Sequence, residues 1–428
     1  MENNNNNNEN RNSDFKNDFP SWASNPAQNS NDQPPGQYNG YHYAPRRRNI
    51  GAIILVIVLI LVGVTVIGNF VVMRTVNRVV SIPLSGTGTP VDQIRFSQTG
   101  VALNIGLARN DVRLETHAGS DFMVVFTPPS RGSYTRPTYE FSQNGMRLNI
   151  VEETSVNVGL FNINTSNNRG TLTVYIPRNL DGAFAGMDIS TSSGSIDIRG
   201  DNGNQLANSA TIRATSGRVR ADGFTADTID VRANSGSIEL DSLTAASGNF
   251  NVRATSGRIR ANGLTAGQGL DINTSSGNID AENIVVNGRL SAETSSGRIT
   301  IQHFIAGSAT IRASSGNVTV NNGQVDNGNL TARTSSGTVR LNNLEVSGNT
   351  YTNTSSGRLT ADNLTVTGNL TMESSSGGMT LGNPRVDGQT SGRATSGNVT
   401  ISGMDDESRL SISTTSGNIT VNGQRWRR

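Results

Sequence analysis

The chain of 428 residues contains no cysteine, one lysine and three histidines. Without cysteine, disulfides, thiolate nucleophiles and cysteine-bound metals are excluded. The single lysine, Lys16, lies near the start of the chain, so lysine Schiff-base chemistry is excluded everywhere beyond it. The histidines are far apart in the sequence, which argues against a metal cluster or a Ser-His-Asp triad; they are His42, His117 and His303.

Aromatic residues are also scarce, at 5%, and the formal net charge is only +2. Few aromatic rings argue against the stacking platforms on which single-stranded nucleic acids, and often carbohydrates, are held. No helix-turn-helix, RNA-recognition or zinc-finger motif is present, and so small a net charge is weak support for a nucleic-acid partner. We therefore expect no catalytic residues, no cofactor, no metal and no nucleic-acid partner.

A short repeat occupies the second half of the chain. Twelve times, Ser-Gly is followed by one residue and then an aliphatic residue, at intervals of 19 to 23 residues that settle at 20. Self-similarity at a fixed short period is typical of a solenoid, in which each repeat buries its apolar face on its neighbours. The repeated glycines are Gly194, Gly217, Gly236, Gly257, Gly277, Gly297, Gly316, Gly337, Gly357, Gly377, Gly397 and Gly417.

The residues around each glycine alternate between apolar and polar. The second and fourth positions after it are apolar in all twelve copies, as in Ile299 and Ile301, and the position between them is polar. A period of two predicts strands with one buried face, and twenty residues are too few for a crossover helix. The sequence predicts an all-β, single-stranded parallel β-helix, a β-solenoid of about 20 residues per coil with three short strands each, right-handed like most parallel crossovers.

The Ser-Gly pair marks a corner of each coil. We expect glycine there because it adopts a positive φ without a steric penalty, and the serine before it can hydrogen-bond to the turning backbone. The twelve serines then form a column along one edge. Since no base stands beside them in the sequence, we interpret this column as structural.

The N-terminal part has a different composition. Residues 1–49 are rich in Asn, Pro and Gln and predict a disordered tail, and 50–73 form an uncharged run long enough to span a bilayer as one helix. Three arginines directly precede this run, whereas only Arg74 and Arg78 follow it closely. Because the more positive flank of a membrane helix stays in the cytoplasm, we expect a single-pass cell-membrane protein with a cytoplasmic N-terminus and an extracellular repeat domain. The remaining segments are a linker at 74–89, irregular β coils with an N-terminal cap at 90–186, regular repeats at 187–423 and a basic end at 424–428.

Two segments resemble a known family. Residues 172–177 read Leu-Thr-Val-Tyr-Ile-Pro, and 189–198 read Ile-Ser-Thr-Ser-Ser-Gly-Ser-Ile-Asp-Ile. A strand that ends in Ile-Pro, followed by Ser-Gly-x-Ile-x-Ile, resembles a bacterial β-strand-repeat family labelled as adhesins, over about residues 90 to 423. The resemblance implies a β-repeat fold, a membrane anchor and a link to the cell envelope or its stress response. It implies no catalytic residues.

Outward positions of the repeats carry regular charges. Four residues before the glycine, arginine recurs in a column that could contact a polyanion such as a cell-wall phosphate polymer; solvated arginines are the alternative. Three residues after the glycine, acidic and basic residues alternate from Asp197 to Asp280, which predicts a self-compensating column. The candidate polyanion-contact arginines are Arg213, Arg232, Arg253, Arg312 and Arg333.

Three functions are compatible with this sequence. The first is a membrane-anchored, surface-exposed, non-enzymatic protein, an adhesin or structural component that binds envelope polymer, polysaccharide or another surface protein. The second is an envelope-stress sensor that acts through a membrane partner. The third, a polysaccharide-active enzyme, is disfavoured because the coils vary too little in length to build a cleft from inserted loops. The oligomeric state stays open.

Overall fold

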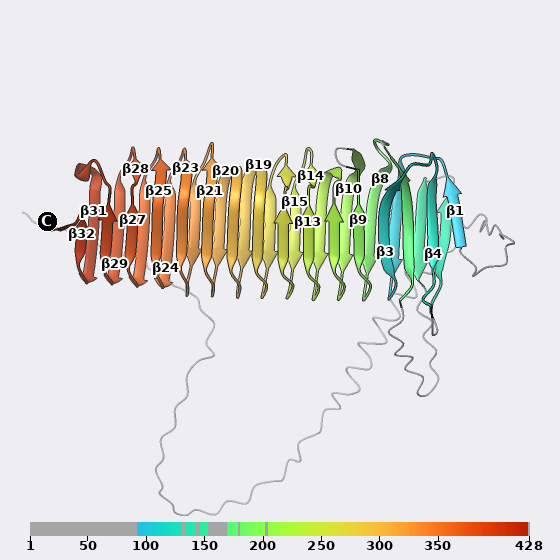
Figure 1. The fold of residues 1–428 in the computed structure, drawn as a ribbon, viewed down its shortest axis with the longest axis horizontal. Coiled ribbons are helices and arrows are strands. Elements are labelled where there is room, and N and C mark those ends of the chain that lie inside the picture. The colour runs from blue at the N-terminus through green and yellow to red at the C-terminus, as the bar shows by residue number, and fades with distance from the viewer. Residues whose placement is uncertain are drawn as a thin grey trace, which may run out of the picture. The chain divides into compact units, whose positions relative to one another are not determined.

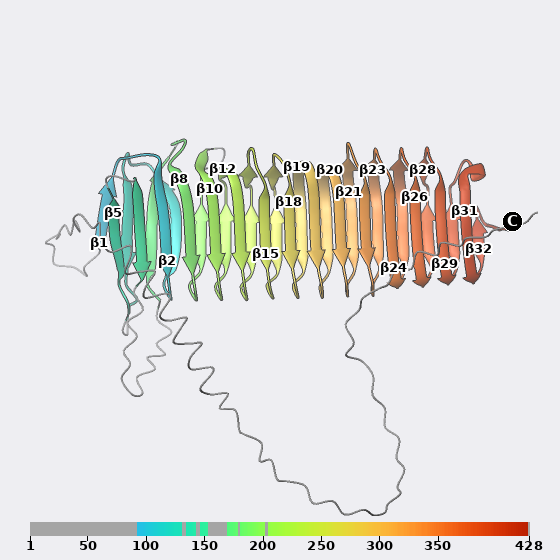
Figure 2. The same ribbon diagram turned by 180° about the vertical axis from the view of Figure 1, so that it is seen from behind.

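The computed structural model describes residues 92–130, 134–142, 146–152, 169–178, 180–201 and 204–426. These residues form an all-β solenoid of stacked, mainly parallel coils, as predicted (Figures 1 and 2). Their one helical element is a 3₁₀ turn, η1 (Glu407–Arg409). The predicted tail, membrane helix and linker lie outside the described residues, and within these no helix is both long and apolar enough to span a bilayer.

Each regular coil consists of three strand segments that pair in register with the next coil. We call them the first face, which precedes the corner glycine, the second face, which follows it, and the third face. Successive coils place Ile229 beside Phe250 on the first face, and Thr244 beside Thr265 on the third. The prediction of three short strands per coil is therefore confirmed.

The regular strands have the following bounds. First-face strands are β8 (Phe184–Thr191), β10 (Gln205–Ala214), β12 (Thr225–Ala233), β15 (Phe250–Ala254), β18 (Leu270–Thr274), β22 (Leu330–Thr334), β24 (Thr350–Ser356), β26 (Leu370–Ser376), β29 (Thr390–Ser396) and β31 (Leu410–Ser416). Second-face strands are β9 (Ile196–Arg199), β11 (Val219–Asp222), β13 (Ile238–Asp241), β16 (Ile259–Asn262), β21 (Val318–Val325), β23 (Val339–Val346), β25 (Leu359–Val366), β27 (Met379–Gly382), β30 (Val399–Ser402) and β32 (Ile419–Val421).

Several strands depart from this simple scheme. Two long strands run through their corners from the second face to the first, β19 (Ile279–Thr294) and β20 (Ile299–Ala313). Separate third-face strands are short: β14 (Thr244–Ala245), β17 (Thr265–Ala266) and β28 (Arg385–Val386). The last strand, β33 (Gln424–Arg425), pairs antiparallel with β32 and ends the sheet.

The N-terminal end, which we predicted as irregular β coils with a cap, contains antiparallel pairs. β2 lies between β6 and β8, and β3 lies between β7 and β9, all parallel. Beyond them β4 pairs antiparallel with β7 and β1, and β5 with β6, so the outermost strands of this end are not a further coil. The strands are β1 (Asp92–Phe96), β2 (Val101–Leu107), β3 (Asp111–His117), β4 (Phe122–Thr127), β5 (Pro137–Ser142), β6 (Arg147–Glu152) and β7 (Thr171–Pro177).

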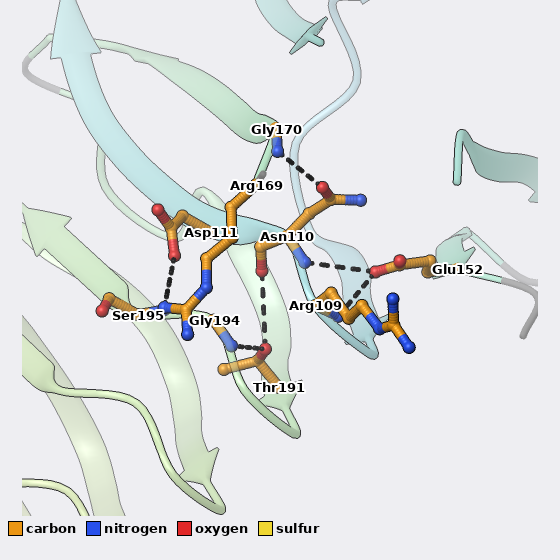
Figure 3. Close-up of polar contacts among 9 residues, drawn as sticks. All are labelled: Arg109, Asn110, Asp111, Glu152, Arg169, Gly170, Thr191, Gly194 and Ser195. Atoms are coloured by element: carbon orange, nitrogen blue, oxygen red, sulfur yellow. Dashed lines mark hydrogen bonds and ion pairs between the residues drawn. The ribbon is translucent and has the colours of Figure 1, made fainter. Parts of the chain in front are cut away.

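A buried carboxylate closes the corner of the first coil. Glu152, only 6% exposed, accepts hydrogen bonds at Oε2 from the backbone N–H groups of Ala108 (2.9 Å), Arg109 (2.9 Å) and Asn110 (3.3 Å), as Figure 3 shows in part. In the next coil, the corresponding N–H of Ser192 donates to a backbone carbonyl instead. Glu152 therefore supplies the acceptor that a preceding coil would provide, and leaves these buried donors satisfied.

Asn110 and Asp111 join this first coil to its neighbours on both sides. The side-chain oxygen of Asn110 accepts from the backbone N–H of Gly170 at 2.7 Å, and its carbonyl accepts from the hydroxyl of Thr191 at 3.4 Å. Asp111 accepts from the backbone N–H of Ser195 at 2.7 Å (Figure 3). These bonds align the cap with the first regular coil.

The core runs through the middle of all three faces. Every residue of the two predicted apolar columns is buried, except Ile419 in the last coil, which is partly buried. Alanine, valine, leucine and isoleucine fill most of the interior, with phenylalanine concentrated near the N-terminal end. Because the described core is continuous from β2 to β32, each coil is stabilised by contact with its neighbours.

The corner glycines are required for a different reason from the one we predicted. Of the twelve, only Gly397 and Gly417 have a φ between 20° and 160°, and their values of 155° and 159° lie close to extended backbone. Instead, each glycine faces the carbonyl oxygen of the corner in the preceding coil. A Cβ on Gly297 would lie 1.9 Å from the oxygen of Gly277, and one on Gly217 only 1.6 Å from that of Gly194. Close backbone packing, and not a left-handed turn, therefore excludes a side chain here.

A hydroxyl three residues before the glycine strengthens the same corner. Thr334 donates to the carbonyl oxygen of Gly316 at 2.7 Å, which links its coil to the one before. Copies without a hydroxyl have alanine there, so the position is always small. The other donors to the preceding corner carbonyl are Thr191, Thr274, Thr294, Thr354, Ser374 and Thr414, at 3.0 to 3.4 Å.

The left-handed conformation occurs instead at a second corner, six residues after the glycine. Glycine, asparagine, serine or histidine stands there, and φ lies between 46° and 80° from Gly223 to Gly423. Asparagine tolerates this region better than most other residues with a side chain. The asparagine amides also bond to one another across coils: Asn363 donates to Asn343 at 3.0 Å, and Asn343 donates to Asn322 at 3.0 Å.

Replacing the corner glycine should be costly at a regular coil. We expect Gly297→Ala to lower the free energy of unfolding by about 3 kcal/mol, because the new Cβ meets a backbone carbonyl that cannot move without shifting two coils. Gly106→Ala is the control, since its Cβ would meet only the Ser190 hydroxyl at 3.7 Å. Denaturant unfolding should show a change below about 0.5 kcal/mol for the control. Equal stability of both variants would contradict the packing argument.

Buried threonines give a second test of the core. Among the described residues, the hydroxyls of Thr350, Thr352 and Thr390 are buried without a hydrogen-bond partner, whereas that of Thr354 donates to Gly337 at 3.0 Å. We expect Thr352→Val to raise the free energy of unfolding by about 1 kcal/mol and Thr354→Val to lower it by about the same amount. Thermal melting of the two variants should therefore shift in opposite directions; shifts of the same sign would show that the hydroxyls are equivalent.

Candidate binding groove

A long open groove follows the edge between the first face and the Ser-Gly corner. It has a volume of about 1080 Å³ and crosses nine coils, from Ser190 to Asn353. At one coil rise of about 4.8 Å, that is roughly 40 Å of length. The floor consists of the small residues three before the glycine, such as Ala254 and Thr294. One wall carries the residues four before the glycine, and the other carries those two before it.

The first wall is the predicted arginine column. Arg213, Arg232 and Arg253 are register neighbours on three successive coils, and Arg312 and Arg333 are neighbours on two later coils. Asn273 and Glu293 fill the two positions between these groups. All five arginines are exposed and line the groove, so the structure brings together the whole predicted set.

Four of the five arginines have a partner within the solenoid. Arg213 pairs with Asp188 at 2.9 Å, Arg232 with Asp230 at 2.7 Å and Arg312 with Glu293 at 3.9 Å. The bond to Asp230, followed by its charge, raises the pKa of Arg232. Arg333 lies over the ring of Tyr351, 4.2 Å from its centre. Arg253 makes no ion pair or hydrogen bond through its guanidinium within the described part of the chain.

The opposite wall carries mainly hydroxyls, and sequence analysis missed it. Its residues are exposed and small, and each lies directly after the buried floor position. The sequence does contain a signal for this wall, because the position two before the glycine is serine or threonine in every copy except one, which has asparagine. The twelve serines that we predicted as a column lie one residue further on and do not line the groove. The wall residues are Ser192, Thr215, Asn234, Thr255, Ser275, Ser295, Ser314 and Ser335.

The C-terminal end of the groove is marked by a polar cluster around Tyr351. The hydroxyl of Tyr351 donates a hydrogen bond to Glu373 on the next coil, while its ring packs against Arg333. Burial, followed by the hydrogen bond and the charge of Glu373, raises the pKa of Tyr351. Asn353, which ends the arginine wall, also donates to Glu373 at 3.4 Å.

The second charge column lies on the second face, away from the groove. Asp197, Arg220, Glu239, Arg260 and Asp280 are register neighbours in alternating sign, as predicted. The ion pairs nevertheless form with other arginines: Arg258 binds Asp280 at 2.6 Å, and Glu239 lies 3.9 Å from Arg218. The acidic side chains of this column therefore pair with arginines outside it, and among the described residues no ion pair joins two members of the column.

The groove offers hydrogen-bond donors and charge along a line, and it is open to solvent. No group of three or more His, Asp or Glu side chains arranged to hold a metal is found among the described residues. Hydroxyl or amide groups recur on successive coils, about 4.8 Å apart, and guanidinium groups occur on five of the nine coils. Such an arrangement can hold an extended chain through many similar contacts.

The comparison with family models identifies the fold. The Toastrack DUF4097 model matches residues 101–304 and 306–425, which is most of the chain. This chain belongs to the Toastrack DUF4097 family. The match agrees with the β-repeat fold that the resemblance implied. It does not test the adhesive role. No curated protein and no solved structure matches the chain.

The raised pKa of Tyr351 gives a pH-dependent stability. The native protein holds the phenolic proton more tightly than the unfolded chain, so the stabilisation is present below about pH 10 and is lost as the pH rises through the raised value. We expect the melting temperature of Tyr351→Phe to fall less than that of the parent between about pH 9 and about pH 12. Tyr134→Phe, at a residue 41% exposed, should behave like the parent. An identical fall in all three proteins would show that Tyr351 does not contribute.

Proposed function

We propose that this chain is a membrane-anchored, non-enzymatic cell-surface protein that holds an extended polymer of the cell envelope in the arginine groove. It would act as an adhesin or as a structural component of the envelope. The apolar run at 50–73 would anchor it with the N-terminus in the cytoplasm.

The groove is the observation that carries the proposal. Its donors repeat once per coil, and its length of roughly 40 Å far exceeds that of a single small molecule. A floor of Ala and Thr side chains keeps it even, so an extended chain can lie along it without meeting a protruding side chain. Many weak contacts along one chain raise the overall affinity without a strong contact at any one of them.

The regular coils also favour binding over catalysis. From Gly194 to Gly417 the corners repeat every 19 to 23 residues, and they stack directly on one another. Enzymes that cleave polysaccharides place catalytic carboxylates in a cleft, which on a solenoid needs inserted loops. Coils of nearly equal length leave an even surface, which suits a binding role.

Blocking the groove should reduce binding to envelope polymer. The probe is the insoluble envelope polymer purified from the organism that encodes the chain, mixed with the full-length protein in detergent. We expect Ser275→Trp to weaken co-sedimentation about fivefold or more, because the indole would occupy the groove. Ser276→Trp is the matched control: this residue is also exposed and is adjacent in sequence, but it does not line the groove.

Melting curves of both variants should match that of the parent, which would show that the solenoid is intact. Equal loss of binding in both variants, or no co-sedimentation of the parent, would overturn the proposed function.

A further inference from the structure

The arginine wall and the outward column beside it, two residues earlier in each coil, are together almost balanced in charge. From the coil of Gly194 to that of Gly357, the outward positions four and six before the glycine carry five arginines and four acidic residues, which leaves a net charge of +1. The acidic residues are Asp188, Asp230, Asp271 and Glu293. A densely charged polyanion would approach nearly as many fixed negative charges as positive ones, and would gain little from long-range attraction.

Arg253 is the exception within this balanced surface. Its neighbour Arg232 is already bonded to Asp230, and the neighbour on its other side is the neutral Asn273. Two residues before Arg253 stands Asn251, whereas the adjoining coils have Asp230 and Asp271 at that position. Among the described residues, no acidic group lies within ion-pair distance of Arg253, so its guanidinium keeps its hydrogen-bonding capacity for a ligand.

Neutral donors and acceptors surround this guanidinium. Across the groove, Asn234, Thr255 and Ser275 present an amide and two hydroxyls on three successive coils. Hydroxyl groups exchange hydrogen bonds with the hydroxyls of a sugar, and a guanidinium binds a carboxylate through two parallel bonds. An extended pyranose unit is also similar in length to one coil rise.

We propose that the groove binds a hydroxyl-rich glycan with widely spaced carboxylates, and that Arg253 receives one carboxylate while the opposite wall binds sugar hydroxyls. This inference rests on the proposed function and specifies its ligand. The few aromatic residues of the chain are consistent with recognition through hydrogen bonds, without ring stacking.

Three polymers of known chemistry test the proposal on the full-length protein. Hyaluronan carries one carboxylate per two sugars, dextran is neutral, and inorganic polyphosphate is charged at every unit. We expect hyaluronan to bind most tightly, with a shallow logarithmic salt slope of at most about one for each bound carboxylate. Arg253→Gln should weaken hyaluronan binding about tenfold and leave dextran binding unchanged.

Arg260→Gln is the matched control, because Arg260 is also exposed but lies on the second face, away from the groove. We expect it to change hyaluronan affinity less than about threefold. An equal loss in both variants would overturn the assignment of Arg253.

Tighter binding of polyphosphate, with a steep salt slope, would overturn the glycan while leaving the groove as a binding site if Ser275→Trp still blocks it. If envelope polymer co-sediments but none of the three polymers binds, the glycan is wrong; if envelope polymer does not bind either, the proposed function fails with it.

Discussion

The stacking of one corner glycine on the carbonyl of the preceding one controls the rest of this structure. Because no Cβ fits between them, successive coils approach as closely as a β-sheet permits at one defined point. From that point the first and second faces run outward in fixed register. The hydroxyl three residues before the glycine adds a hydrogen bond to the same carbonyl in seven coils, which holds the corner in place.

Because the register is fixed, each outward position forms a column along the solenoid. This limits which charged side chains can occupy neighbouring coils. Like charges in one column lie about 5 Å apart and repel, unless the neighbouring column supplies the opposite charge. Asp188 and Asp230 do this for Arg213 and Arg232, while Glu293 pairs with Arg312 within the column itself. The result is a groove with many polar contacts whose arginines are largely compensated by acids in and beside it, and Arg253 alone among the five arginines has no partner in the described solenoid.

The two ends of the solenoid require different solutions, since a coil at the end has no neighbour to satisfy its backbone. At the N-terminal end Glu152 supplies the missing acceptor, and antiparallel strands cover the first coils. At the C-terminal end β33 folds back on β32, and Trp426 packs against the core. The regular coils are therefore held by the same corner contact throughout, while each end of the solenoid depends on side chains that occur only there.

The sequence determined the solenoid, its three strands per coil and the arginine column, because a residue repeated every twenty positions must occupy equivalent places in stacked coils. The sequence showed where glycine recurs but not why glycine is required there. Close contact with Gly277 excludes a side chain at Gly297, and this contact exists only after the coils stack. Likewise, the sequence contains arginines and acids without showing which of them pair. Only the tertiary structure decided that Arg213 meets Asp188 from another coil while Arg253 meets no acid among the described residues, because pairing depends on distances between coils that the order of residues does not contain.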